Sequence, residues 1–178
     1  MTLMSLDKRV GQLVILLACA PQSSKSDSAQ AAPSLDSLVL ERTECFGSCP
    51  AYRLRISSAE QVRFESHNRR DSANVATDTA PPGTYAHLVT RAQAIGFYDL
   101  PPDIIKDSVF CRVAMTDAPT FVTTIFSKDA VKRVSDYSGC ALTTPRTVPP
   151  PLQRLRAFEN EIDSVLRSSR WIRPNPRR

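Results

Sequence analysis

A strict alternation of apolar and polar side chains over residues 51–66 constrains the fold of this chain more than any other feature. Tyr52, Leu54 and Ile56 alternate with polar residues, and residues 61–66 repeat the same period after a short polar break. A period of two places successive side chains on opposite faces of a strand. The pattern therefore predicts a hairpin that buries only one of its faces.

The register of this hairpin follows from its apolar residues. The pairing that keeps them together sets Ser57 opposite Gln61, Ile56 opposite Val62, Leu54 opposite Phe64 and Arg53 opposite Glu65. A slip by one residue would turn Val62 and Phe64 toward water, so it is disfavoured. The predicted turn is Ser58-Ala59-Glu60, which lacks the glycine that usually occupies the left-handed position of a three-residue turn.

The rest of the chain contains further periodic segments. Strands are predicted over residues 37–43, 120–126 and 130–134, with a short strand at Val75, and helices over 84–95 and from Pro149–Pro151 to about Ser168. The expected apolar faces of the helices are Tyr85, Leu88, Val89, Ala92 and Ile95, then Leu152, Leu155, Phe158, Ile162, Val165 and Leu166. Trp171 is expected to cover the core. The order predicts an α+β domain: an antiparallel sheet built from two hairpins, with two helices packed on one face.

The N-terminus has the features of an export signal. Lys8 and Arg9 precede an apolar run over residues 10–18. As a helix this run would rise only about 14 Å, too short for a bilayer core of about 30 Å. A removed signal peptide over residues 1–18 is therefore expected, in preference to a permanent transmembrane helix.

Leu16-Leu17-Ala18-Cys19 resembles the bacterial lipobox. The resemblance implies that the Cys19 thiol is acylated and becomes the mature N-terminus, and Ala20 implies the outer membrane facing the periplasm. Two alternatives are ordinary cleavage after Ala18-Cys19-Ala20, with plain secretion, and a cytosolic protein with a chance apolar start. Pro21 disfavours ordinary cleavage, because proline resists the extended pose that a peptidase needs.

Composition divides the remainder into three parts. Residues 19–36 are rich in Ser, Ala and Pro and read as a lipidated cysteine with a flexible tether, followed by a single domain over 37–171. Residues 172–178 form a basic tail, read as solvated, although basic runs also attract phosphate-rich partners. The net charge is +5, yet no nucleic-acid-binding motif is present, so no nucleic-acid partner is expected.

Besides Cys19 the chain has four cysteines: Cys45, Cys49, Cys111 and Cys140. In an exported protein they are expected to oxidise. Three pairings are possible, and position favours Cys45 with Cys49, around a reversal that Gly47 permits, and Cys111 with Cys140, around the second hairpin. A Cys₄ zinc site and thiol-disulfide exchange at Cys45 and Cys49 are alternatives, although the spacing is a weak match to zinc motifs and places three residues between the cysteines where C-x-x-C has two.

The two histidines, His67 and His87, have no spacing that indicates a metal site or a catalytic triad. His87 lies beside apolar positions of the first predicted helix, which favours a partly buried side chain. His67 ends a strand and is followed by a polar loop.

The acidic candidates fall in connections. Asp99, Asp103 and Asp107 lie in a proline-rich segment, and Asp117 precedes an Ala-Pro pair. Turn formation and solubility explain such positions. No catalytic residue, metal or cofactor is therefore predicted.

The sequence C-F-G-S-C-P-A-Y over residues 45–52, placed between a leucine-rich strand and a hairpin, resembles a bacterial family called domain of unknown function 6438. The segment 116–119, Ile162-Asp163 and Trp171 agree with the rest of its pattern, so the resemblance covers about residues 36–171. Members usually carry a Gly-Asp-Gly-like turn where this chain has Ser58-Ala59-Glu60. The resemblance implies exported proteins, often lipoproteins, and implies no activity.

Together these observations favour a non-catalytic binding or structural module of the cell envelope, anchored in the membrane through its lipid. Its expected partner is an envelope protein or polysaccharide. An enzyme of thiol exchange or a zinc-binding domain is the alternative.

Overall fold

The computed structural model describes residues 36–67, 74–143 and 145–172. The predicted signal peptide, Cys19, the tether up to residue 35 and the tail beyond Ile172 lie outside the described residues. The fold below is that of the domain alone.

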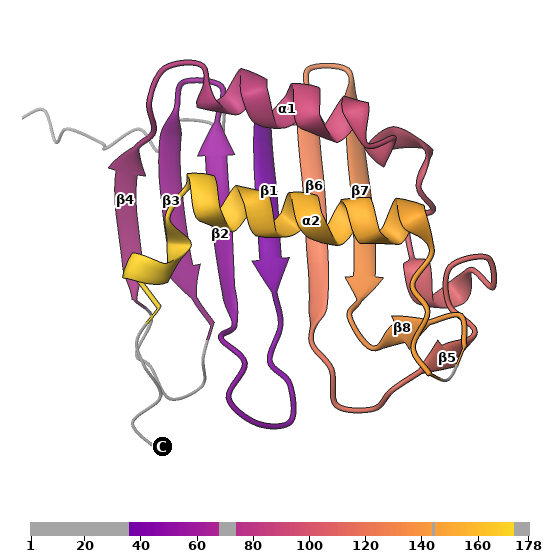
Figure 1. Cartoon of the computed structure of the whole chain (residues 1–178). Coiled ribbons are helices and arrows are strands. Elements are labelled where there is room, and N and C mark those ends of the chain that lie inside the picture. Colours follow the sequence, from indigo (N-terminus) through magenta and orange to yellow (C-terminus); the bar gives the residue numbers. More distant parts are fainter. Residues whose placement is uncertain (1–35, 68–73, 144, 173–178) are drawn as a thin grey trace, which may run out of the picture. The chain divides into compact units, whose positions relative to one another are not determined.

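Six strands form one antiparallel sheet in the order β4-β3-β2-β1-β6-β7 (Figure 1). Their bounds are β1 Ser37–Arg42, β2 Tyr52–Ser57, β3 Gln61–Ser66, β4 Val75–Thr79, β6 Thr120–Ser127 and β7 Ala130–Tyr137. The first strand of the domain, β1, lies near the middle of the sheet and pairs with β2 on one side and β6 on the other. It thereby joins the two predicted hairpins into one sheet.

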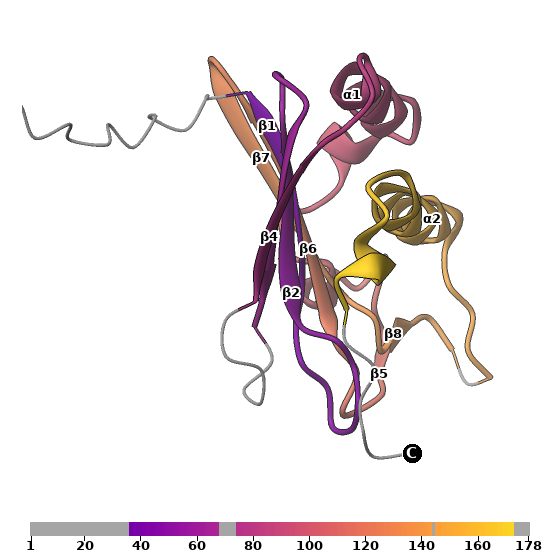
Figure 2. The same cartoon turned by 90° about the vertical axis from the view of Figure 1, so that its left-hand side faces the viewer.

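Two helices, α1 (Thr84–Ala94) and α2 (Pro150–Val165), lie on the same face of this sheet (Figure 2). Three short 3₁₀ helices follow or join them: η1 Phe97–Asp99, η2 Ile104–Lys106 and η3 Ser168–Arg170. The predicted α+β architecture is therefore confirmed. Within the described ranges, no helix has the length and apolarity needed to cross a membrane.

The first hairpin has the predicted register, with Leu54 opposite Phe64 and Ile56 opposite Val62. Its turn places Glu60 in the left-handed region at φ 60° without a glycine. Four hydrogen bonds hold this residue, and in one of them its own N–H donates to the Ser57 carbonyl oxygen (2.9 Å). Its carbonyl oxygen accepts from the Ala80 N–H (2.9 Å), and its carboxylate accepts from the N–H groups of Gly83 (2.9 Å) and Tyr85 (3.0 Å). The carboxylate thus caps the first turn of α1, which offsets the backbone strain.

The core lies between the sheet and the helices. Its fully buried side chains include Leu38, Leu40, Leu54, Ile56 and Phe64 from the sheet and Leu88, Leu152, Leu155, Phe158 and Ile162 from the helices. Trp171 packs against this cluster, with its ring centroid 5.4 Å from that of Phe64. Both amphipathic faces predicted from the helical period are thus used to cover one side of the sheet.

Several details differ from the prediction. Residue 75 begins a full edge strand, β4, because residues 75–79 find backbone partners along β3. A small sheet of β5 (Val113–Ala114) and β8 (Cys140–Ala141) was not expected. On α2, Val165 is 36% exposed, whereas Glu159 faces the core and is fully buried.

Candidate functional site

Both disulfides lie at one end of the domain, on segments that leave the sheet (Figure 1). Cys45–Cys49 closes the connection between β1 and β2, with Cα atoms 5.5 Å apart. Cys111–Cys140 closes the segment that contains the β6–β7 hairpin, with Cα atoms 5.0 Å apart. These are the two pairs that residue position favours.

The Cys111–Cys140 corner is packed closely around the β5–β8 pair. Ala114 pairs with Cys140, and the Met115 N–H donates to the Gly139 carbonyl oxygen (3.1 Å). A Cβ atom at residue 139 would lie 2.5 Å from the Met115 oxygen, so only glycine fits there. The corner is a fixed platform beside the first disulfide loop.

The Cys45–Cys49 loop is attached to this platform by backbone hydrogen bonds. The Thr43 N–H donates to the Thr120 carbonyl oxygen (3.0 Å), and the Phe46 N–H donates to that of Asp117 (3.3 Å). Asp117 itself takes a left-handed turn at φ 68°, as its position before Ala-Pro suggested. Within the loop Gly47 adopts φ 138°, a conformation that other residues rarely reach.

Phe46 is the most exposed large apolar residue that the structure describes. It is 88% exposed and lies within the five-residue segment that the disulfide closes. Met115 (49% exposed) and Val113 (37% exposed) belong to the adjoining platform. We call Phe46, Val113 and Met115 the apolar tip. An aromatic ring held in water by a covalently closed loop contributes nothing to the core, and with its apolar neighbours it is the candidate contact surface of the domain.

The sequence contains a signal for this site that composition alone does not bring out. Phe46 is an aromatic residue in a segment with no strand or helix period, between two cysteines that position pairs. A ring of this size has no core of its own, so an apolar side chain in it either packs on the rest of the domain or faces solvent. The motif predicts the bridge, but it does not decide between these two positions for its aromatic ring.

The geometry of the cysteines gives little support to the two chemical alternatives, a zinc site and thiol-disulfide exchange. All four sulfurs are joined in disulfides, so none of them is a thiolate that could bind zinc. Cys45 and Cys49 lie between two strands and not at a helix N-terminus, where the helix dipole would lower the pKa of a thiol. Among the described residues, no group of three His, Cys, Asp or Glu side chains is placed to hold a metal ion.

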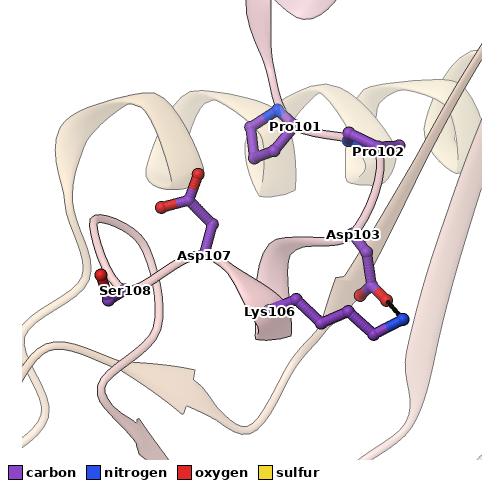
Figure 3. Close-up of a pocket in the computed structure, with 6 residues that line it drawn as sticks. All are labelled: Pro101, Pro102, Asp103, Lys106, Asp107 and Ser108. Carbon is purple, nitrogen blue, oxygen red and sulfur yellow. Dashed lines mark ion pairs between the residues drawn. The ribbon is translucent and has the colours of Figure 1, made fainter.

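The predicted acidic candidates take part in local contacts (Figure 3). Asp103 forms an ion pair with Lys106 (3.0 Å), and an Asp107 carboxylate oxygen accepts from the Val109 N–H (2.8 Å). With Pro101, Pro102 and Ser108 these residues line an open hollow of about 500 Å³. Figure 3 shows the two carboxylates turned away from each other, so they do not form a catalytic pair.

The histidines lie apart on the surface. His87 was expected to be partly buried, which is wrong: its side chain is 54% exposed and lies 3.1 Å from Glu161 of α2. The reason is its position on α1, where it flanks the buried stripe of Leu88 and Ala92. His67 is exposed after β3, and its N–H donates to the Ala51 carbonyl oxygen (2.8 Å).

A row of charged groups lies between α2 and the sheet. Asp163 accepts hydrogen bonds from the Arg42 guanidinium (2.7 Å), the Tyr52 hydroxyl (2.6 Å) and the Ser168 hydroxyl (2.6 Å). Burial, followed by the charge of Asp163 and the hydrogen bond to it, raises the pKa of Tyr52 well above its usual value. The phenol therefore stays a donor at any physiological pH.

Two helical turns before Asp163, Arg156 forms a bidentate pair with Asp136 of β7, at 2.7 and 2.9 Å. The Asp136 side chain is fully buried, and the Arg156 side chain is 16% exposed. The same guanidinium donates to the carbonyl oxygens of Tyr137 and Cys140. The pair therefore fastens α2 to the Cys111–Cys140 corner.

Glu159 lies between these two contacts and is the most perturbed acid of the domain. Burial, followed by the charge of Asp136, raises its pKa to about 8. Its Oε1 accepts from the Thr123 hydroxyl (3.2 Å), whereas no hydrogen-bond partner reaches its Oε2 within the part of the chain described. Since the group is fully buried between helix and sheet, we interpret it as part of the packing and not as a catalytic acid.

Comparison with known proteins gives a family and no activity. The family model described as Domain of unknown function (DUF6438) matches residues 36–165. No curated protein matches the chain. The matched range runs from the start of the described domain through α2, and it includes both disulfides.

Proposed function

Because the chain belongs to the family described as Domain of unknown function (DUF6438), which names no activity, we propose a function from the geometry of the domain. The protein is an exported, lipid-anchored binding module of the cell envelope. Its apolar tip is the contact surface, and Phe46 is the residue that a partner protein encloses. The exposure of Phe46 within a loop closed by a disulfide is the observation that carries this proposal.

The two disulfides support an oxidising compartment, since such bonds persist outside the cytosol. The lipobox-like Leu16-Leu17-Ala18-Cys19 supports an anchor at Cys19, and Ala20 supports the outer membrane facing the periplasm. Stable anchoring takes at least two acyl chains, which lipid attachment of this kind supplies. The lipid anchor would hold the domain at the membrane surface, and the apolar tip would determine which partner protein the domain binds there.

Preorganisation is the physical advantage of the loop. A bridge of five residues, closed by the disulfide and tied to Asp117 through the Phe46 N–H, has little conformational entropy left to lose when a partner binds. Aromatic side chains that fill a partner's pocket are typical of residues that dominate binding energy. A substitution at Phe46 is therefore expected to weaken binding without weakening the fold.

A protein partner fits the tip better than a membrane surface. Glu44 and Asp117 flank Phe46, and carboxylates are repelled by the anionic lipids of a bilayer. A single projecting ring fits a concave apolar pocket, the usual site for such anchors in protein interfaces. Direct insertion into lipid and contact with a polysaccharide are the outcomes that an experiment must separate from this one.

Photocrosslinking in native cells tests the proposal. p-Benzoyl-phenylalanine replaces Phe46 in the full chain, and the matched control carries it at Val131, which is 63% exposed in a different part of the domain. We expect position 46 to give a discrete protein adduct that position 131 does not give. Adducts with lipid or glycan alone, the same adducts from both positions, or no adduct would each overturn the proposal.

A binding measurement with the adduct partner completes the test. Purified partner should bind the full chain, and Phe46→Ser should weaken this binding by tenfold or more, since buried aromatic anchors contribute about 2 kcal/mol or more. The unfolding midpoint of Phe46→Ser should match that of the wild type. Unchanged affinity in the variant would exclude Phe46 as the anchor.

A further inference from the structure

The sheet has two edge strands, and the fold covers one of them and leaves the other open. Beside β7, the Ser135 N–H donates to the Pro102 carbonyl oxygen (2.9 Å), and Asp103 forms a parallel bridge with Ser135. The other edge is β4, at the left of Figure 1, and no described residue pairs with its outer side. A strand with an open edge is a template for pairing with another chain.

Two hydrogen bonds establish which residues of β4 face β3. The Ser66 N–H donates to the Asn74 carbonyl oxygen, and the Ala80 N–H donates to that of Glu60, both at 2.9 Å. In an antiparallel pair, residues that bond to the neighbouring strand alternate with residues whose backbone groups point away from it. Since residues 74 and 80 bond to β3, the even-numbered residues of β4 face β3 and the odd-numbered residues face outward.

The outward residues are Val75, Thr77 and Thr79. Among the described residues no hydrogen-bond partner is found for the backbone groups of Val75 and Thr77, whereas the Thr79 N–H bonds to the carboxylate of Asp78. All three side chains are exposed, on the face of the sheet that the helices do not cover (Figure 2). Because β-branched residues favour strands, the sequence keeps this edge extended without burying it.

β4 has few of the features that protect open edges in other proteins. Proline, lysine and a bulge that interrupts the register are typical of such strands. β4 contains neither proline nor lysine, and its register with β3 is continuous from Val75 to Thr79. Its one charged residue, Asp78, forms an ion pair with Arg170 of η3. The residues of the strand therefore do not oppose pairing with a further strand.

We propose that β4 pairs antiparallel with β4 of a second copy of this chain, about a two-fold axis at Thr77. In this register Thr77 lies opposite Thr77 of the second copy, and Val75 lies opposite Thr79. The central pair exchanges two hydrogen bonds, and each Val75 N–H donates to the Thr79 carbonyl oxygen of the other copy. A shift by one residue would set outward groups against residues that bond to β3, and a shift by two would leave outward residues unpaired.

Charge and closure are the reasons for choosing a second copy as the occupant. The two-fold register places Asp78 opposite Ala76, so the two Asp78 carboxylates do not oppose each other, and the small Ala76 side chain leaves room for the pair of Asp78 with Arg170. Threonine opposite threonine is a favourable cross-strand pair. The pairing uses both β4 edges, and the β7 edges are covered, so the assembly closes as a dimer and does not grow into a fibre.

The dimer is expected to be weak in solution. Pairing through one short strand is expected to bury less than the roughly 1,200 Å² at which specific, stable interfaces begin. Confinement of both copies at a membrane by the proposed lipid anchor would raise their effective concentration. The pairing itself depends neither on the anchor nor on the apolar tip, so it is tested without the tip's partner.

Cysteine crosslinking of the full chain in native cells tests the register. Opposed residues of a hydrogen-bonded pair have Cα atoms about 5.5 Å apart, within the range that a disulfide spans. Thr77→Cys, oxidised with copper phenanthroline, should therefore give a disulfide-linked dimer that peptide mass mapping assigns to residue 77. Thr79→Cys is the matched control on the same edge. It should give roughly tenfold less dimer, because the register separates its two copies by about 14 Å.

Three results would overturn the proposal: no dimer from Thr77→Cys, equal yields from Thr77→Cys and Thr79→Cys, or linkage of residue 77 to a different protein. The last result would assign the edge to a strand of another partner.

Thr77→Pro gives an independent measurement. The Thr77 N–H faces away from β3, so proline removes a hydrogen bond of the dimer and none within the domain. Sedimentation equilibrium of the full chain in detergent should show a dimer whose association constant falls roughly tenfold or more in Thr77→Pro, at a similar unfolding midpoint. Equal association of the variant, or a wild type that stays monomeric up to about 1 mM, would contradict the proposal. If Thr77→Pro lowers the unfolding midpoint, the two cysteine yields decide.

Discussion

At the scale of single residues, the unusual feature is how many charged groups α2 turns toward the sheet. Arg156, Glu159 and Asp163 fall on one side of the helix, on the same stripe as Leu152 and Leu155. Arg156 and Asp163 have partners of opposite charge, whereas the partner of Glu159 is the uncharged hydroxyl of Thr123. Burying a charge without such a partner is costly, so the group is expected to hold a proton instead.

The protonation of Glu159 makes stability depend on pH. Its pKa is about 8 in the folded protein against 4.5 for the unperturbed group. The folded state therefore holds more protons between these values, and the stabilisation present below pH 4.5 is lost as pH rises to about 8. The loss is expected to be on the order of 2–5 kcal/mol, since one pKa unit corresponds to about 1.4 kcal/mol.

Glu159→Gln checks this expectation, because the amide keeps the shape of the protonated acid and does not ionise. Urea unfolding from pH 5 to 9 should show the wild type losing stability relative to Glu159→Gln as pH rises. Glu161→Gln is a control that makes the same change two positions away, at a partly exposed carboxylate paired with His87 and Arg91. Parallel pH curves for Glu159→Gln and the wild type would show that Glu159 does not titrate in this range.

The pair of Arg156 and Asp136 makes a second prediction at this scale. Asp136→Asn should lower the free energy of unfolding by about 3–5 kcal/mol, because it leaves a guanidinium largely buried without its counter-charge. The double variant Asp136→Leu with Arg156→Met should lose less than the two single variants together. Chemical denaturation gives the values.

The control for this pair is Asp78→Asn, which breaks the exposed ion pair between Asp78 and Arg170. It should move the unfolding midpoint much less than Asp136→Asn does. Equal effects of the two substitutions on the unfolding midpoint would show that burial does not determine how much an ion pair contributes to stability.

At the scale of elements, the two disulfides close loops of very different length. Cys45–Cys49 spans a sequence separation of 4, and Cys111–Cys140 spans 29. The longer loop removes more conformational entropy from the unfolded chain, with estimates of about 3.5 kcal/mol against about 2 kcal/mol for the short loop. Cys140 is also fully buried in the corner that holds β5 and β8.

Removing the bridges one at a time should therefore give unequal results. Cys111→Ala with Cys140→Ala is expected to lower the melting temperature more than Cys45→Ala with Cys49→Ala. Calorimetry under non-reducing conditions makes the comparison. A larger loss from the short bridge would mean that strain or packing, and not loop entropy, determines their contributions.

The elements that sequence predicted best are those whose period is undisturbed. The alternation of Leu54 and Ile56 determined the register of β2 and β3, because only one register buries all the apolar side chains. The β5–β8 pair was missed because two-residue strands have no period to detect. Glu159 was missed because an acidic residue on a helix is expected outside, and only the fold places the Thr123 hydroxyl where it can donate to this carboxylate.

The candidate surfaces were predictable to a different degree. The cross-strand pairing of Arg55 with Arg63 follows directly from the predicted register. The exposure of Phe46 does not follow from the small size of its ring alone and also depends on Asp117, which lies far along the chain and positions the loop. Long-range contacts of this kind leave no local pattern in a sequence.

At the scale of the whole molecule, the proposed anchor and the two surfaces require the chain to reach the envelope. Our proposal assigns acylation to Cys19, so labelling with an alkyne fatty acid should mark the wild type in native cells. Cys19→Ala should lose the label and accumulate as a longer precursor. Cys45→Ala with Cys49→Ala is the control and should keep the label. Label that persists in Cys19→Ala would exclude the lipid anchor.

The central position of β1 has a consequence for chains that are cut short. This strand is the first of the domain to be synthesised, yet one of its two neighbours, β6, begins only at Thr120. A product that terminates earlier can form the β1–β2–β3 meander but leaves one edge of β1 with backbone groups unsatisfied. Such edges recruit strands from other chains. We expect these fragments to aggregate through the edge that β6 normally covers, and a fragment extended past Ser127 to remain dispersed for longer.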